Sequence, residues 1–199
     1  MLWIAITSPA FHDGEAEFIG RLLAHGVDIV HLRKPDAREE DCAALLGKLS
    51  AEERSRIVIH DFFQLAPRYG LRGIHLNSRH SEIPAGYAGH VSRSCHSLEE
   101  LVKYRAGYTY LFLSPVFDSI SKEGYASAFD EASLRKASGE GIIGSRTVAL
   151  GGVTPGKVAM LRSLGFGGAA MLGCVNRLAS LPVQEQVEAL ERMRLEFII

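Results

Sequence analysis

Polar side chains follow several of the apolar stretches in this chain, and their types suit the binding of a phosphorylated ligand. His31 and Arg33, His60 and Asp61, and His75 each stand at or just beyond the end of such a stretch. A guanidinium such as that of Arg33 binds a phosphate or carboxylate through two parallel hydrogen bonds. Asp61 is the acidic residue best placed near this cation, where it can hold a metal ion or accept a proton.

Two apolar stretches near the end of the chain run directly into glycine. Residues 148–150 lead to Gly151 and Gly152, and residues 168–172 lead to Gly173 and Cys174. Helix starts follow both turns, so free backbone N–H groups and the helix dipole favour a bound anion there. Two such turns in tandem predict a phosphate site, although an ordinary tight turn also explains Gly-Gly. The Cys174 side chain is interpreted as a small apolar filler, because no base accompanies it.

Each of the polar side chains also has a purely structural explanation. Arg33 can pair with a nearby acid such as Asp61 or Asp36. His75 lies in a short apolar stretch, where a hydrogen-bonded core histidine is common. Lys122 lies in a polar loop and can be an ordinary solvated charge. These alternatives stay open at the level of sequence.

The apolar pattern predicts eight strand–helix units, which favour a compact single-domain (β/α)8 TIM barrel of the α/β class. In such a barrel the polar residues at the strand ends gather on one rim, where active sites lie. An open doubly wound sheet is the alternative, but no G-x-G-x-x-G follows the first strand. The strands are predicted at residues 2–7, 27–32, 57–59, 73–75, 90–94, 108–113, 148–150 and 168–172. The helices are predicted at residues 15–25, 38–49, 98–104, 129–138, 155–164 and 181–195, with one or two helical turns at residues 62–69.

The composition narrows the function classes. The 199 residues suit one domain spanning 1–199, and 22 basic against 23 acidic side chains give no surface for nucleic acid or anionic membrane. No apolar run reaches the ~20 residues of a membrane span. Three separated cysteines form neither a metal motif nor a disulfide framework, and the first residues show no secretion signal. We therefore expect a cytoplasmic protein.

An ordered series of motifs over about residues 4–175 resembles the thiamine-phosphate synthase family, which includes the TenI-type thiazole tautomerases. The motifs are His31-Leu-Arg33, Ile59-His-Asp61, Gly73-Ile-His-Leu76, Ser94-Cys-His-Ser97, Ser114-Pro-Val-Phe117, Ser119-Ile-Ser-Lys122, Ala149-Leu-Gly-Gly-Val153 and Gly168-Ala-Ala-Met-Leu-Gly173. The resemblance implies a small (β/α)8 barrel. It also implies an enzyme that joins a pyrimidine-methyl pyrophosphate to a thiazole phosphate, with Mg²⁺ on the pyrophosphate. The sequence leaves open whether the chain forms a homodimer.

The resemblance implies roles for individual residues. Arg33 and Lys122 match the cations that bind the pyrophosphate and stabilise the charge that develops on it, so they are the expected catalytic residues. Asp61 matches a ligand of Mg²⁺. The positions expected to bind the substrates are His31, Arg33, His60, Ser94, Ser119, Ser121, Lys122, Gly151, Gly152, Gly173 and Cys174.

The chain departs from the family pattern at several of these positions. His31 and His60 stand where the synthases have Gln and Asn, and the motif lysine after Arg33 is shifted to Lys34. The synthases have a second carboxylate ligand of magnesium a few residues after the position of His75, but this chain has Asn77-Ser-Arg79-His80 there and no acidic residue. The tautomerases place a catalytic histidine where this chain has Pro115, which cannot transfer protons. Neither pattern is complete.

Three functions follow from this mixture. The first is a thiamine-phosphate synthase with an altered metal site. The second is a tautomerase-like isomerase in which His31, His60 or His96 moves the proton. The third is a phosphate-ligand binder that has lost turnover. A metal hydrolase that uses His31, His60 and His75 as ligands is a more remote fourth hypothesis, because such a site would have only one acidic residue, Asp61, beside it.

Overall fold

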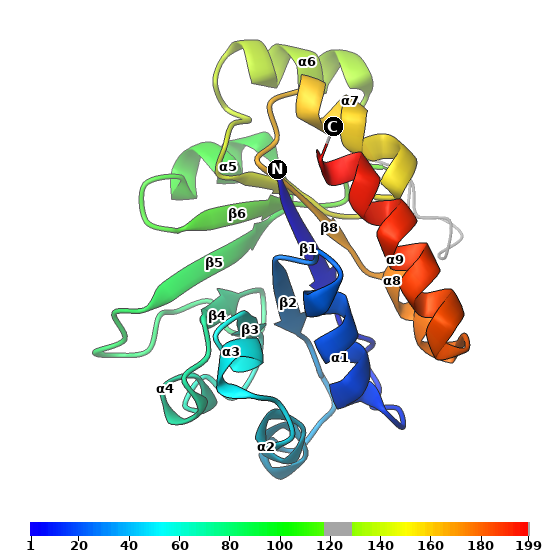
Figure 1. Ribbon diagram of the computed structural model, residues 1–199. Coiled ribbons are helices and arrows are strands. Elements are labelled where there is room, and N and C mark those ends of the chain that lie inside the picture. The colour runs from blue at the N-terminus through cyan, green and yellow to red at the C-terminus, as the bar shows by residue number, and fades with distance from the viewer. Residues whose placement is uncertain (118–128, 199) are drawn as a thin grey trace.

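The computed structural model describes residues 1–117 and 129–198, and its strands form a closed parallel barrel. Each strand pairs with its neighbours in the sequence, and β8 pairs with β1 to complete the ring. Figure 1 shows the helices around the outside of this ring. The predicted (β/α)8 barrel is confirmed. The strands are β1 (Leu2–Ile6), β2 (Ile29–Leu32), β3 (Ile57–Ile59), β4 (Gly73–Leu76), β5 (His90–Cys95), β6 (Tyr110–Leu113), β7 (Thr147–Ala149) and β8 (Gly168–Met171).

The helices agree with the predicted segments to within a few residues. They are α1 (Glu15–Ala24), α2 (Glu39–Gly47), α3 (Ala51–Arg54), α4 (Leu65–Tyr69), α5 (Leu98–Tyr104), α6 (Glu131–Gly139), α7 (Val158–Ser163), α8 (Gly173–Asn176) and α9 (Val183–Ile198), with 3₁₀ turns η1 (Pro155–Lys157) and η2 (Arg177–Ser180). The short α3 was not predicted. Residues 77–89, all of which are described, contain no helix, so an irregular loop connects β4 to β5. No helix in the described part of the chain is long and apolar enough to cross a membrane.

Side-chain caps set several of the helix starts. Asp130 accepts a hydrogen bond from the Ser133 N–H, so α6 begins at Glu131 rather than at residue 129. Ser97 caps α5 by accepting a hydrogen bond from the Glu100 N–H. The Ser97-Leu-Glu-Glu100 sequence has the pattern of a capping box, but the box is incomplete, because the Glu100 carboxylate accepts from the N–H of His96 instead of that of Ser97. Thr154 holds the N-cap position before Pro155 but makes no side-chain cap.

Alternation along the strands separates two apolar layers. One layer lies between the strands and the surrounding helices and includes Leu32, Ile59 and Leu76. The other fills the barrel and is formed by Ile4, Ile6, Ile29, Val58, Tyr110, Phe112, Val148 and Ala170. Residues at even spacing from these inner positions also point into the barrel. His31, two residues after Ile29, and His60, two residues after Val58, therefore face its interior.

Candidate active site at the barrel mouth

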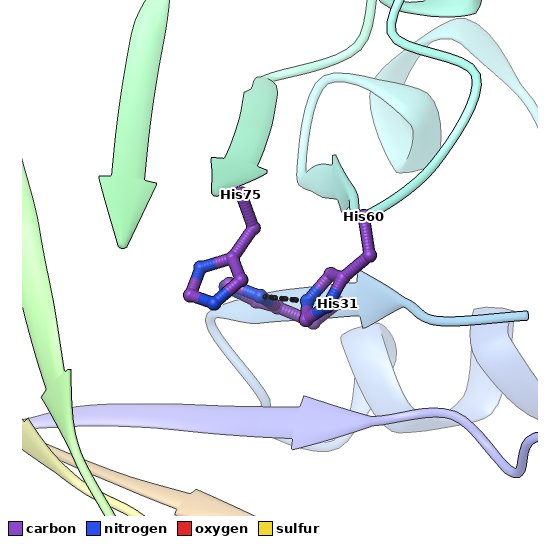
Figure 2. A group of neighbouring side chains, drawn as sticks. All are labelled: His31, His60 and His75. Atoms are coloured by element: carbon purple, nitrogen blue, oxygen red, sulfur yellow. Dashed lines mark hydrogen bonds between the residues drawn. The ribbon is translucent and has the colours of Figure 1, made fainter. Parts of the chain in front are cut away.

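Three histidines from adjacent strands meet inside the barrel. Figure 2 shows the rings of His31 from β2, His60 after β3 and His75 from β4 pointing toward one another. The Nδ1 atom of His31 lies 2.8 Å from the Nε2 atom of His60, and its Nε2 atom lies 2.6 Å from the Tyr110 hydroxyl. The two ring nitrogens of His75 lie 2.8 Å from the hydroxyls of Ser92 and Ser94.

Burial keeps these imidazoles uncharged near neutral pH. The side chains of His31, His60 and His75 are 0–4% exposed, and loss of hydration disfavours the charged form. Burial, reinforced by positive charge on neighbouring groups, lowers the pKa of His31 and His60 well below its usual value. The same cause lowers the pKa of His75 to about 3. Each ring can therefore donate one hydrogen bond and accept one.

The carboxylate of Asp61 is already engaged by two basic side chains. Its oxygens lie 2.9 Å and 3.3 Å from the Arg79 guanidinium and 3.1 Å from Nε2 of His80. Both partners come from the loop after β4. Phe62, the next residue, has φ 55, an uncommon value for a residue other than glycine. The backbone therefore turns sharply immediately after Asp61.

Arg33 lies at the barrel mouth beyond the end of β2. Its backbone N–H donates to the Thr7 hydroxyl, and its side chain is partly exposed. Within residues 1–117 and 129–198, no carboxylate forms an ion pair with its guanidinium, so the structural pairings with Asp61 and Asp36 are not formed. The positive charge of Arg33 is available to an anionic ligand.

Lys34, in contrast, serves the fold. Its ammonium donates to both carboxylate oxygens of Glu15 and to the carbonyls of Ser8 and Ala10. The side chain is 1% exposed. Burial lowers the pKa of Lys34, and the Glu15 carboxylate partly opposes that effect. The lysine therefore anchors the β1–α1 loop and cannot add charge to the ligand site.

The two glycine turns after β7 and β8 are adjacent, as the phosphate-site prediction requires. Gly151 and Gly152 have φ values of 90° and 60°, which favour glycine. A Cβ atom on Gly151 would lie 2.7 Å from Pro115. The Cys174 thiol lies 3.7 Å from the Val153 carbonyl and links one turn to the other. In the described chain, no backbone carbonyl accepts from the N–H groups of Gly151, Gly152, Gly173 and Cys174.

Sequence reasoning missed two cations near the predicted site. Arg177 is exposed, and its Nη1 lies 4.0 Å from the position that a Cβ on Gly173 would take. The spacing of four residues, one helical turn after a glycine, was the available signal. Arg79 was noted only because it lies in the stretch where the family pattern has its second magnesium carboxylate. Ser119, Ser121 and Lys122 fall outside the described residues, so the structure does not place them.

A model of the thiamine monophosphate synthase family matches residues 3–175. The chain belongs to this family. A thiamine-phosphate synthase of Serratia proteamaculans is 28% identical over 170 residues, which cover 81% of this chain and 80% of that protein. A thiamine phosphate pyrophosphorylase from Bacteroides thetaiotaomicron is 33% identical, with a TM-score of 0.88 over 100% of this chain and 98% of that one.

Membership of the thiamine monophosphate synthase family confirms the resemblance drawn from the motifs. It also identifies the chain as a transferase of the thiamine-phosphate synthase type. A thiamine phosphate pyrophosphorylase from Pyrococcus furiosus, 19% identical, has the same fold, with a TM-score of 0.76 over 98% of this chain and 94% of that one. Named synthases among the relatives favour the first of the three functions over tautomerase and silent binder.

Proposed function

We propose that this member of the family joins a pyrimidine-methyl pyrophosphate to a thiazole phosphate and releases pyrophosphate. The observation that carries the proposal is the distribution of anion-binding groups on one rim of the barrel. Arg33, without a carboxylate partner in the described chain, follows β2, and the two glycine turns follow β7 and β8. Two separate anionic groups therefore have separate places on the same rim, as a two-substrate reaction requires.

The thiazole phosphate is assigned to the paired turns. The N–H groups of Gly151, Gly152, Gly173 and Cys174 lack backbone acceptors and can donate to phosphate oxygens. Arg177 stands next to Gly173 and supplies positive charge. Because Pro115 packs against Gly151, a larger residue there would disturb the turn.

The pyrophosphate is assigned to the side of the rim that carries Arg33. As the bond from the methylene carbon to the pyrophosphate oxygen breaks, charge accumulates on the leaving oxygens. A guanidinium held there stabilises that charge as it develops. Lys122 is the second proposed cation, by its place in the family motif. The pyrimidine is assigned to His31, His60 and Ser94 by their places in the family pattern; His31 would act through its hydrogen bond to His60, because its other ring nitrogen is bonded to Tyr110.

Magnesium is expected from the family, and Asp61 is the proposed ligand. The described residues do not fit a resident ion by themselves, because this single carboxylate already holds Arg79 and His80. Hard divalent cations prefer several oxygen ligands. Asp61 would hold magnesium only in place of Arg79, with the remaining oxygen ligands coming from the pyrophosphate. A homodimer and a cytoplasmic location stay predictions.

The deciding experiment combines the two substrates with purified protein and Mg²⁺ and detects thiamine phosphate by chromatography. We expect product from the natural chain and strongly reduced product from Arg33→Gln. Arg38→Gln is the matched control, because Arg38 is exposed and paired with Asp41. Saturable binding of thiazole phosphate without product would refute the synthase assignment and leave a binder or a tautomerase. Exchange of solvent deuterium into the thiazole would then separate those two.

A further inference from the structure

The histidine cluster inside the barrel has the composition and spacing of a metal site. One ring nitrogen from each of His31, His60 and His75 lies within 4.8 Å of the others. The three rings converge from neighbouring strands (Figure 2). We infer that in the substrate-free protein, where no pyrimidine occupies His31 and His60, these imidazoles bind a divalent transition metal of the Zn²⁺ class, at a site separate from the rim carboxylate Asp61.

The ligand type selects the class of metal. Imidazole nitrogen suits zinc, cobalt, nickel and copper, whereas magnesium and calcium require oxygen ligands. Three protein nitrogens with a fourth position for water or another ligand form a recurrent catalytic zinc arrangement. The strands β2, β3 and β4 are hydrogen-bonded neighbours, so they hold the three rings on a rigid frame.

For His31 and His75, the outer ring nitrogens already have the partners that metal-bound histidines need. Ligating histidines usually hold their second ring nitrogen on a hydrogen-bond partner, which fixes the orientation of the ring. Tyr110 fills this role for His31 at 2.6 Å. Either Ser92 or Ser94 fills it for His75 at 2.8 Å, leaving the opposite nitrogen for the metal.

Binding exchanges one hydrogen bond for the metal without removing a proton from the cluster. In the metal-free protein a proton lies between Nδ1 of His31 and Nε2 of His60. When both nitrogens coordinate the ion, His31 carries its proton on Nε2 toward Tyr110 and His60 carries its proton on Nδ1. All three imidazoles stay neutral. The two nitrogens must separate from 2.8 Å to about 3.3 Å, the edge of a tetrahedron with zinc–nitrogen bonds of about 2.05 Å.

The surroundings favour an anion as the fourth ligand. The wall beside the cluster is aromatic, with the Phe112 ring 4.9 Å and 4.8 Å from the rings of His31 and His75. The cluster of described ligands contains no carboxylate, and Asp61 is paired elsewhere. Neutral ligands leave the full charge of the ion, so hydroxide or another small anion would complete the site. Ser94 is partly exposed and marks the side that opens to the mouth.

The test uses substrate-free protein stripped with a chelator and titrated with Co²⁺, whose visible absorption reports coordination by nitrogen ligands. We expect one equivalent to bind with visible bands that Zn²⁺ displaces. His75→Asn should abolish the bands, and Tyr110→Phe should weaken binding about 10- to 100-fold, because it removes only the partner of a ligand. His80→Asn and His96→Asn, which alter exposed histidines, should keep the bands. Circular dichroism confirms that each variant is folded.

Three results would overturn the inference: no stoichiometric bands in the natural chain, bands that survive in folded His75→Asn, or bands lost in His96→Asn. The second and third would place the ion on surface histidines. The test is independent of the proposed synthase reaction, since it uses no substrate and no turnover. Asp61→Asn should retain the cobalt bands, which separates this site from the magnesium assignment at the rim.

Discussion

The guanidinium of Arg79 lies 2.9 Å and 3.3 Å from the two carboxylate oxygens of Asp61. A permanent cation therefore covers the carboxylate that the family pattern assigns to magnesium. In Arg79→Gln this competing charge is gone, and we expect the affinity for Mn²⁺, a paramagnetic substitute for Mg²⁺, to rise about tenfold. Electron paramagnetic resonance of free Mn²⁺ measures it. Arg68→Gln, an exposed arginine away from Asp61, is the control, and equal affinities in the two variants would contradict the competition.

Arg33 offers a second test at the mouth. Because its guanidinium has no described carboxylate partner, its removal should affect the ligand rather than the fold. We expect Arg33→Gln to lower kcat/KM for synthase turnover by roughly 100-fold, the cost of losing one preorganised charge donor. Steady-state assays across both substrates measure the loss. An unchanged kcat/KM in Arg33→Gln would show that Arg33 does not take part in the reaction.

Gly151 should tolerate no side chain. Its φ of 90° strains any other residue, and a Cβ would lie 2.7 Å from Pro115. We expect Gly151→Ala to lower the free energy of unfolding by about 1–3 kcal/mol and to weaken thiazole phosphate binding. Urea unfolding and calorimetric titration measure the two effects. Gly156→Ala is the matched control, because a Cβ there meets nothing within 4 Å. Equal stability of the two variants would contradict the close approach.

The buried pair of Lys34 and Glu15 predicts a strong asymmetry between single and double variants. Lys34→Met leaves the Glu15 carboxylate buried without its cation, which should cost about 3–5 kcal/mol of unfolding free energy. The double variant Lys34→Met with Glu15→Leu removes both charges and should recover most of that loss. Urea unfolding of all three proteins supplies the comparison. If the double variant were as unstable as the single one, the loss would come from altered packing and not from a buried carboxylate without its cation.

His90 should make the fold sensitive to acid. Burial, with the positive charge of Arg72 as a second cause, lowers the pKa of His90 to about 4. Below the unfolded value of 6.5 the unfolded chain takes up a proton that the folded chain refuses. Stability from this group is therefore complete above that pH and is lost as the pH falls toward about 4. His90→Asn should reduce proton uptake on unfolding by about one. Urea unfolding at several pH values measures it, and an unchanged pH slope would refute it.

The fold was predictable because it depends on repeated local signals. Apolar strands such as Val148 to Leu150 and glycine stops such as Gly151 recur in order around the barrel. The site was only partly predictable, since side chains from distant segments complete it. Nothing near Asp61 in the sequence identifies Arg79 as its partner, because the contact depends on the path of the loop after β4.

Neighbouring residues of the same charge also have different roles, for reasons that their spacing in the sequence does not reveal. Arg33 and Lys34 are adjacent cations, yet alternation turns one toward the mouth and buries the other against Glu15. The sequence groups His31, His60 and His75 only as residues that end adjacent strands. Their convergence on one another depends on the register of β2, β3 and β4, which only the closed sheet fixes.

The closure of the barrel by β1 and β8 also bears on how the chain folds during synthesis. The first strand pairs on one side with β2 and on the other with Gly168 to Met171, more than 150 residues later. Until β8 leaves the ribosome, one edge of β1 presents unpaired backbone groups to any other strand. The ring therefore forms late, through contacts of high sequence separation, and folding should be slow for a chain of this length. Newly made, incomplete chains are the species most exposed to aggregation, whatever the stability of the finished barrel.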